Sequence, residues 1–190
     1  MTLCYIQARA GSKRFPGKNK ALWNGIPMVE DAIRKAQECH IFDTIIVTSD
    51  DREIRQIAIR CGVFPMCRSE ETASDMATDD DVAREVLADF PDAGIVCKLY
   101  PCVPLLKVVD MIHAYQFMLS PGKEDWWDGV HSALLGEKGY YWKDAGAFYF
   151  FRAKAFRKKG SMAFGSSFIW TRKDIDGVDI NTPDDLEAAK

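Results

Sequence analysis

Hydrophobic and polar positions alternate along the chain in blocks that predict strands and helices in turn. Residues 3–7 and 44–48 are apolar or β-branched enough to form buried strands. After the second block, Ile54, Ile57, Ala58 and Cys61 recur at the spacing of one helix face. The same reasoning predicts further strands at 63–66 and 94–99 and further helices around 28–36, 82–90 and 108–119. Strands alternating with helices indicate parallel pairing, with helices on both faces of the sheet.

The last third of the chain is less regular. Residues 126–135 fit a strand or a loop, whereas 147–151 and 167–171 have the composition of short strands. Thr182 and Pro183 are typical of the cap and first residue of a final helix. Because there is no internal repeat or composition break, we expect residues 1–190 to form one Rossmann-like α/β domain with a doubly wound, mostly parallel sheet.

The composition excludes several classes of protein. The chain has 190 residues, of which 47% are hydrophobic and 28% charged, as in ordinary soluble domains. No apolar run approaches the roughly 18 residues of a membrane span, and the start lacks the basic leader of a signal peptide. The net charge of −3 argues against a non-specific nucleic-acid binder.

The cysteines indicate the compartment. The chain has six, none at CxxC spacing, and its three histidines lie far apart, so neither a zinc site nor a disulfide framework is expected. We interpret the cysteines as small core side chains of a protein in the reducing cytoplasm.

Positive charge is concentrated in one loop. Between Ala8 and Lys20 there is no acidic residue, and the basic ones are Arg9, Lys13, Arg14, Lys18 and Lys20. The loop follows a buried strand, and turns at the carboxyl ends of parallel strands converge where such sheets bind ligands. Gly11 and Gly17 allow tight turns whose N–H groups can hold an anion. A solvated basic loop is the alternative, but five cations repel one another unless an anion is bound.

The loop lacks the GxxxxGK[ST] and GxGxxG patterns, but residues 6–19, IQARAGSKRFPGKN, closely resemble another signature. This is the first loop of the acylneuraminate and pseudaminic acid cytidylyltransferase family, the CMP-sialic acid synthetase type. Three more stretches resemble motifs of that family in the same order: 42–51, Arg68 with 72–75, and 178–186. Residues 99–104 and 144–149 resemble the pseudaminic acid branch, so the similarity extends over most of the chain.

The resemblance implies an enzyme that transfers CMP from CTP to a nonulosonic acid and releases pyrophosphate. It implies three catalytic cations, Arg9, Lys13 and Lys18, which would neutralise the triphosphate. The residues that it implies for nucleotide binding are Ala8, Arg9, Ala10, Gly11, Ser12, Lys18, Asn19, Arg68 and Asp75. For Arg68, a surface salt bridge with Glu70 or Glu71 is the alternative.

The resemblance also implies a Mg²⁺ ion near the carboxyl terminus. Asp179 lies in an apolar run, where an isolated charge is costly, so we predict it to be a metal ligand. The family has a second aspartate where this chain has Asn181, which can still offer a neutral oxygen. Asp184 and Asp185 are explained as acids at a helix N-terminus.

The middle of the chain departs from the family. The segment around 120–140, where the family carries a longer arm for dimerisation and sugar binding, is largely absent here, so the resemblance leaves a homodimer undecided. Aromatic residues crowd this part of the chain, as a hydrophobic closure or an exposed patch: Trp126, Trp127, Tyr140, Tyr141 and Trp142. Two alternatives stay open. One is another sugar nucleotidyltransferase, of the 3-deoxy-manno-octulosonate or spore-coat-polysaccharide type, and the other is a nucleotide-binding module that has lost catalysis.

Overall fold

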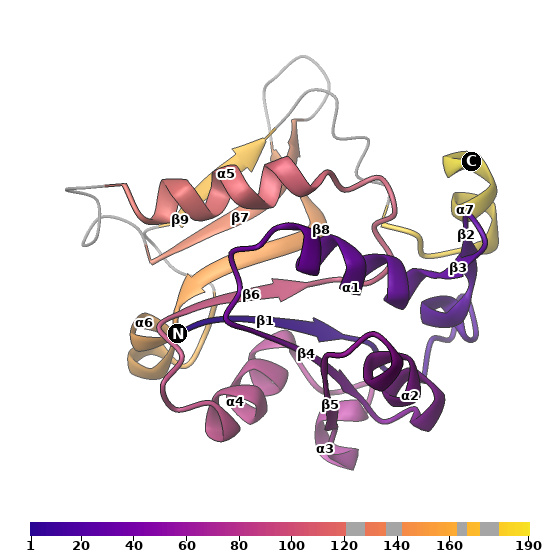
Figure 1. Ribbon diagram of the computed structural model, residues 1–190, viewed down its shortest axis with the longest axis horizontal. Helices are drawn as coiled ribbons and strands as arrows, with labels where there is room; N and C mark the ends of the chain where they lie inside the picture. The colour runs from indigo at the N-terminus through magenta and orange to yellow at the C-terminus, as the bar shows by residue number, and fades with distance from the viewer. Residues whose placement is uncertain (121–127, 136–141, 163–166, 172–178) are drawn as a thin grey trace.

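The computed structural model describes residues 1–120, 128–135, 142–162, 167–171 and 179–190, and a seven-stranded sheet lies at its centre (Figure 1). The order of the strands across the sheet is β5-β4-β1-β6-β8-β7-β9. Their bounds are β1 Thr2–Gln7, β4 Thr44–Ser49, β5 Phe64–Cys67, β6 Ile95–Leu99, β7 Gly129–Leu135, β8 Trp142–Arg152 and β9 Ser167–Thr171. A separate hairpin pairs β2 (Leu22–Trp23) with β3 (Ile26–Pro27).

Most of the sheet is parallel, as predicted. β1 pairs in parallel with both β4 and β6, β4 pairs in parallel with β5, and β7 pairs in parallel with β9. β8 is the exception, because it runs antiparallel to β6 and to β7. The hydrophobic pattern of a strand is the same in either direction, so the sequence did not reveal this reversal.

Helices cover both faces of the sheet, which confirms the doubly wound arrangement (Figure 1). On one face, α1 (Met28–Glu38), α2 (Arg52–Arg60) and α5 (Val108–Met118) pack on buried residues such as Ile6 and Leu99. On the other face, α4 (Asp79–Asp89) and α6 (Ala153–Lys159) pack on a second cluster that includes Tyr5 and Phe151. The remaining helices are α3 (Glu70–Ala73), α7 (Pro183–Ala189) and the 3-10 turn η1 (Lys18–Lys20).

Local capping signals fix the helix starts. Thr182 is the N-cap of α7, as predicted, and accepts a hydrogen bond from the N–H of Asp185. The Asp185 carboxylate accepts in return from the N–H of Thr182, which was not predicted. Thr78 and Asp81 make the same reciprocal pair at the start of α4. Between the strand predicted at 3–7 and the helix predicted around 28–36, the chain contains η1 and the hairpin, which were not predicted; α3 and α6 were not predicted either.

The predicted aromatic cluster lies mostly outside the described residues. Trp126, Trp127, Tyr140 and Tyr141 fall in undescribed segments, and of Trp142 only its place at the start of β8 is described. The shortened segment around 120–140 therefore stays a prediction.

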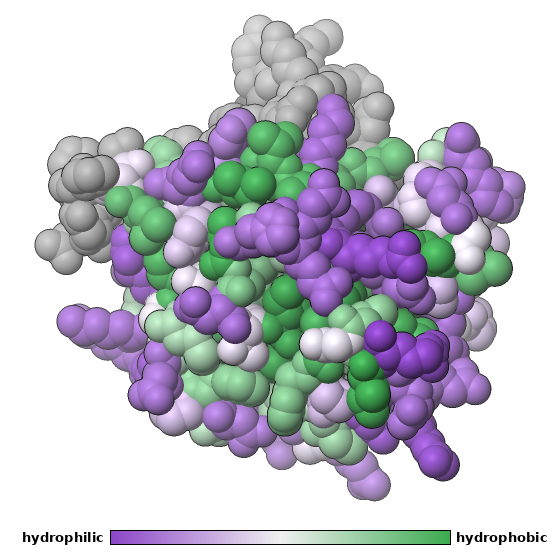
Figure 2. Space-filling model, viewed as in Figure 1, coloured by the Kyte–Doolittle hydropathy of each residue, from purple (hydrophilic) through white to green (hydrophobic). Residues whose placement is uncertain are grey.

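Figure 2 shows hydrophobic residues reaching the surface along α5, where Val109 is 39% and Leu119 49% exposed.

Two expectations from the composition can be compared with the structure. All six cysteines are free, and the interpretation of them as core side chains fits Cys4, Cys39, Cys97 and Cys102; Cys61 is only partly buried, and Cys67 is exposed. Among the residues that the structure describes, no helix is long and apolar enough to cross a membrane.

Candidate functional site

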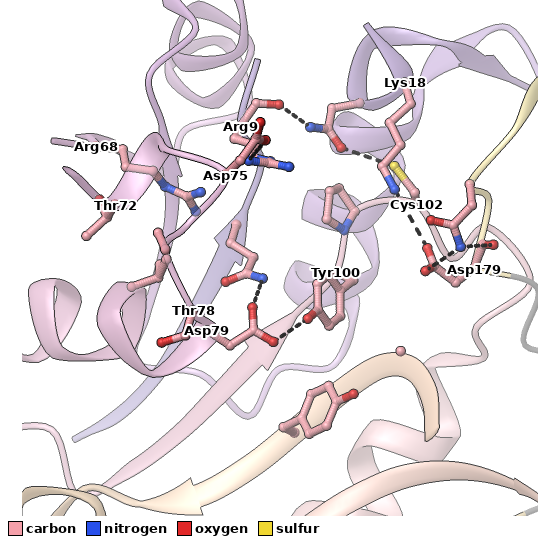
Figure 3. A pocket seen from close by; sticks show the side chains of 18 of the residues that line it. Arg9, Lys18, Arg68, Thr72, Asp75, Thr78, Asp79, Tyr100, Cys102 and Asp179 are labelled. Carbon is pink, nitrogen blue, oxygen red and sulfur yellow. Dashed lines mark hydrogen bonds and ion pairs between the residues drawn. The ribbon is translucent and has the colours of Figure 1, made fainter. Parts of the chain in front are cut away.

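A cavity of about 800 Å³ lies at the carboxyl ends of β1, β5 and β6, where the topology predicts a ligand site (Figure 3). Its walls come from distant parts of the chain: the loop after β1, the turn between β5 and α4, the turn after β6, the start of β8 and the segment before α7. Predicted site residues on these walls are Arg9, Lys18, Asn19, Arg68, Asp75, Asp179 and Asn181. The fold therefore brings three of the four sequence motifs to one cavity, and the fourth, residues 42–51, contacts the basic loop through Asp50.

Asp75 holds two of the predicted catalytic cations. Arg9 Nη1 lies 2.9 Å from Asp75 Oδ1, and Lys13 Nζ lies 2.5 Å from Asp75 Oδ2. The hydrogen bonds from Lys13 and then Arg9 hold the pKa of the Asp75 carboxyl below its ordinary value. The prediction that these cations repel one another unless an anion binds is therefore wrong, because an acid distant in sequence already pairs with them.

The other cations of the loop are also paired by tertiary structure. Lys20 contacts Asp51 and Glu53 at 2.9 and 2.5 Å, and Arg14 donates to Asn181 Oδ1 at 2.7 Å. Four of the five cations nevertheless share a second cavity of about 360 Å³, which is lined by Arg9, Ser12, Lys13, Arg14, Lys18 and Asn19. Lys20 does not line this second cavity.

The backbone is held at the start of the loop. The N–H of Ala8 donates to Thr48 O at 3.0 Å, and the N–H of Ala10 donates to Asp50 Oδ1 at 2.8 Å. Gly17 has φ of 72°, a conformation that favours glycine. A Cβ on Gly11 would meet nothing within 4 Å, and its φ is not in the left-handed region, so the fold by itself does not require glycine there.

Asn19 connects two walls of the cavity. Its Nδ2 donates to the carbonyl oxygen of Arg9 at 2.8 Å, and its Oδ1 accepts from Cys102 Sγ at 3.1 Å. Asn19 is 6% exposed. The two ends of its amide therefore connect the basic loop to the turn after β6. The side chain also lines the cavity.

Arg68 is buried, and two of its donors are unused. The residue is 6% exposed, and its guanidinium points into the cavity (Figure 3). Nε and Nη2 have no hydrogen-bond partner within the described parts of the chain. Burial lowers the pKa of Arg68, against the attraction of Asp50 and Glu85. A surface salt bridge with Glu70 or Glu71 does not fit this placement, whereas a ligand acceptor in the cavity does.

Asp179 lies on the opposite wall, beside Lys18. Lys18 Nζ is 4.0 Å from Asp179 Oδ1 and donates to Ile180 O at 3.2 Å. Burial raises the pKa of the Asp179 carboxyl, with Lys18 opposing that effect. Gly146 of β8 lies beside Asp179 and has φ of 58°, a conformation that favours glycine; a Cβ there would make an ordinary van der Waals contact with the Asp179 carboxylate, 3.5 Å away. The carboxylate is thus half-buried next to a cation and faces the cavity.

Asn181 is oriented by its neighbours. Its Nδ2 donates to Asp179 Oδ2 at 2.9 Å, while its Oδ1 accepts from Arg14. In this conformation the amide oxygen faces away from Asp179. Within the described residues no three His, Cys, Asp or Glu side chains gather to hold a metal ion.

Sequence reasoning missed a polar network on the floor of the cavity. Asp79 accepts from Gln7 Nε2 and Tyr100 Oη at 2.6 and 2.5 Å (Figure 3). It also accepts from Lys98 Nζ at 2.6 Å. Lys98 Nζ also lies 3.8 Å from the centre of the Tyr149 ring. One signal was present: Lys98, like Asp179, is a charge within an apolar run and therefore needs a partner.

Similarity to known proteins agrees with this site. A family model described as cytidylyltransferase matches residues 3–132. The pseudaminic acid cytidylyltransferase of Campylobacter jejuni is 28% identical over 218 residues, covering 99% of this chain and 94% of the relative. The CMP-N,N'-diacetyllegionaminic acid synthase of Legionella pneumophila is 32% identical over 126 residues, covering 64% of this chain and 54% of the relative.

Solved structures support the fold. A CMP:2-keto-3-deoxy-manno-octonic acid synthetase complexed with CTP superposes with a TM-score of 0.74 at 18% identity, covering 99% of this chain and 96% of that chain. A 4-diphosphocytidyl-2C-methyl-D-erythritol synthase from Anaerococcus prevotii gives 0.75 at 13% identity, with coverage of 99% and 95%. Together with the family match and the cavity built from the basic loop, Arg68 and Asp179, these similarities show that the chain belongs to the cytidylyltransferase family of CTP-dependent nucleotidyltransferases.

Proposed function

We propose that the chain transfers CMP from CTP to an acidic sugar of the pseudaminic or sialic acid type and releases pyrophosphate. The observation that carries the proposal is one cavity in which unused arginine donors, a basic loop and a half-buried carboxylate face one another. The similarity to the Campylobacter jejuni pseudaminic acid cytidylyltransferase, which spans nearly both chains, supports this class of acceptor over the other sugar nucleotidyltransferases.

The charges suggest how CTP lies in the site. Arg68 would contact the nucleoside, and the triphosphate would follow the basic loop into the second cavity, among Arg9, Lys13 and Lys18. Asp75 keeps Arg9 and Lys13 in place before the ligand arrives. Phosphate oxygens would then share or replace that carboxylate as the partner of the two cations, at the mouth of the basic loop.

The reaction needs placement and charge neutralisation more than covalent help from the protein. The anomeric hydroxyl oxygen of the sugar attacks the α-phosphorus, the bond from phosphorus to the bridging oxygen breaks, and pyrophosphate leaves with both electrons of that bond. The hydroxyl proton passes to solvent. Arg9, Lys13 and Lys18 would neutralise the charge that builds on the leaving pyrophosphate.

The residues present fit a Mg²⁺ ion bound together with the nucleotide. Mg²⁺ commonly takes one or two carboxylates, with phosphate and water oxygens completing its coordination, and Asp179 supplies one carboxylate on the cavity wall. When bound, such an ion would supply charge neutralisation at the phosphates. Asn181 would contribute its oxygen only after release from Arg14, so Asp179 is the principal ligand in this proposal.

The acceptor would lie on the side of the cavity opposite Arg68. There the turn at the start of β8 contributes Asp144 and Gly146, and Tyr149 donates its hydroxyl hydrogen bond to Asp144. Residues 144–149 are the stretch that resembles the pseudaminic acid branch. We place the sugar beside this stretch.

The six free thiols support a reducing cytoplasm as the location of the protein. Light scattering of the purified chain decides whether it is a homodimer.

Pyrophosphate release from CTP, measured over a panel of acidic sugars, tests this function. We expect release that requires both CTP and one member of the panel. The second candidate, a nucleotide-binding module without catalysis, is favoured by Asn181 in place of the expected aspartate. It predicts stabilisation by CTP with Mg²⁺ in a thermal shift assay and no pyrophosphate with any acceptor, an outcome that would overturn the enzymatic proposal.

A further inference from the structure

Polar side chains replace apolar ones along one face of the sheet just as its strands reach the cavity. Leu3, Tyr5, Ile46 and Met66 belong to the core cluster beneath α4. Side chains two residues apart on a strand share a face, so Gln7, Thr48 and Arg68 continue these rows toward the cavity. The N–H of Arg68 donates to Ser49 O at 3.2 Å, which extends the pairing of β5 with β4. Gln7 and Arg68 therefore stand on the same floor.

The unused hydrogen-bonding atoms of this floor are complementary. Arg68 offers two donors without partners, and Gln7 Oε1 is a buried acceptor without a partner among the described residues. Both side chains line the cavity. Unpaired buried polar atoms are costly, so a ligand that pairs with them gains the energy of satisfying them.

Asp79 fixes which end of the Gln7 amide faces the ligand. Gln7 Nε2 donates to Asp79 Oδ1 at 2.6 Å, and a carboxylate can only accept. Asp79 is itself held by Lys98 and Tyr100. Although burial opposes ionisation, these donors keep the pKa of the Asp79 carboxyl below its ordinary value. The Gln7 amide therefore cannot reverse without placing its oxygen against a carboxylate, and it presents an acceptor only.

We propose that Gln7 is a specificity-determining residue for the base of the nucleotide, and that its Oε1 accepts a hydrogen bond from the 4-amino group of cytosine. This inference rests on the proposed function, since it assigns the nucleoside end of the CTP site. Arg68 donates to the two acceptors of the same base, O2 and N3. Cytosine presents amino donor, ring acceptor and carbonyl acceptor in that order along its pairing edge.

The spacing of the strands fits this assignment. β5, which leads into Arg68, lies two strand spacings from β1, or about 10 Å. A pyrimidine edge with a hydrogen bond at each end spans about the same distance. Uracil places a carbonyl where cytosine has its amino group, so that carbonyl would meet Gln7 Oε1, acceptor against acceptor. The fixed amide thus favours CTP and disfavours UTP.

Binding of three triphosphates to Gln7→Leu and to the unaltered protein tests the inference. The probes are CTP, UTP and the 2-pyrimidinone analogue of CTP, which lacks the 4-amino group. The unaltered protein is expected to bind CTP at least about 10-fold more tightly than either of the others. Gln7→Leu is expected to bind CTP and the analogue equally, since each change removes the same hydrogen bond. Gln116→Leu, the same substitution on an exposed face of α5, should keep the preference of the unaltered protein.

Each outcome decides one question. If Gln7→Leu keeps the full preference for CTP over the analogue, Gln7 does not read the base and the inference is overturned. If the unaltered protein binds CTP and UTP equally, the inference fails while nucleotide transfer stands. If it binds none of the three, the proposed function itself fails. Should Gln7→Leu not fold, Gln7→Asn withdraws the same oxygen by one carbon and is expected to lower the preference in the same direction.

Discussion

Arg68 shows how a single side chain can favour function at the expense of stability. Its guanidinium is buried at the cavity, two of its donors have no partner in the part of the chain that the structure describes, and burial lowers its pKa. Such a group costs free energy in the empty protein and recovers it when a ligand binds. Substitution of Arg68 can therefore separate an effect on stability from an effect on ligand binding.

Arg68→Met is expected to raise the KM for CTP about 10- to 100-fold, because it removes hydrogen bonds from a charged group. The same change should leave the Tm equal or raise the stability by about 1 kcal/mol, since it removes an unpaired buried charge. Steady-state kinetics and calorimetry on one preparation measure both effects. A lower Tm with an unchanged KM would mean that Arg68 serves the core and not the ligand.

Asp179→Asn is expected to abolish turnover and leave the fold intact. The substitution removes a half-buried carboxylate whose pKa burial has raised, so the folded protein should lose little stability. Circular dichroism and pyrophosphate release check the two statements. Asp184→Asn is the matched control, an exposed acid in the first turn of α7. Near-normal kcat/KM in Asp179→Asn would exclude Asp179 as the metal ligand.

The reciprocal N-caps at Thr78 and Thr182 lie next to acidic residues that line the cavity, Asp79 and Asp179. The cap at Thr182 also ties down Asn181, whose N–H donates to Asp185 Oδ2 at 2.8 Å. Thr182→Ala is expected to lower the free energy of unfolding by about 1 kcal/mol. Thr182→Ser keeps the hydroxyl and should lose much less, as measured by urea unfolding. Equal losses for the two variants would show that the methyl packing of Thr182 matters and the cap does not.

The ion pair between Asp79 of α4 and Lys98 of β6 should make the stability of the fold depend on pH. Because the pKa of Asp79 is lowered in the folded protein, its ionised form stabilises the fold fully above the ordinary aspartate pKa of about 3.9. That stabilisation is lost as the pH falls through the lowered value. Asp79→Asn should be less stable than the unaltered protein by about 1–3 kcal/mol at neutral pH, a modest value because the Asp79 side chain is 40% exposed.

Urea unfolding between pH 6 and pH 2.5 measures this difference. The two stability curves should converge as the pH falls, since protonation removes from the unaltered protein what the substitution removes from the variant. Asp80→Asn, at the next position of α4, serves as the reference substitution. Curves that stay parallel down to the lowest pH would contradict the assigned role of the Asp79–Lys98 pair.

The hydrophobic pattern predicted individual strands and helices better than it predicted which segments contact one another. Residues 44–48 and the helix face starting at Ile54 were found because a buried strand or helix repeats its apolar positions locally. The direction of β8 and the pairing of Asp75 with the basic loop depend on contacts between distant segments. No local pattern encodes such contacts, so the charge repulsion expected in the loop was overestimated.

At the scale of the whole molecule, the topology explains why three separated motifs form one site. Parallel strands end at the same edge of the sheet, so the loop after β1, Arg68 after β5 and the turn after β6 converge there. Asp179 joins them from the other end of the chain because the N–H of Ile180 donates to Cys102 O at 2.8 Å. Sequence analysis did not identify Gln7 and Asp79 as a pair, because only the fold brings β1 and α4 together.

The central claim is that this cavity transfers CMP itself, with cleavage between the α- and β-phosphates. CTP labelled at the α-phosphate, incubated with Mg²⁺ and the acidic sugars, tests it most directly. The account predicts that the label moves into a CMP-sugar while the pyrophosphate released carries none. Label that stays in CTP with every acceptor, or that appears only as free CMP or CDP, would contradict it.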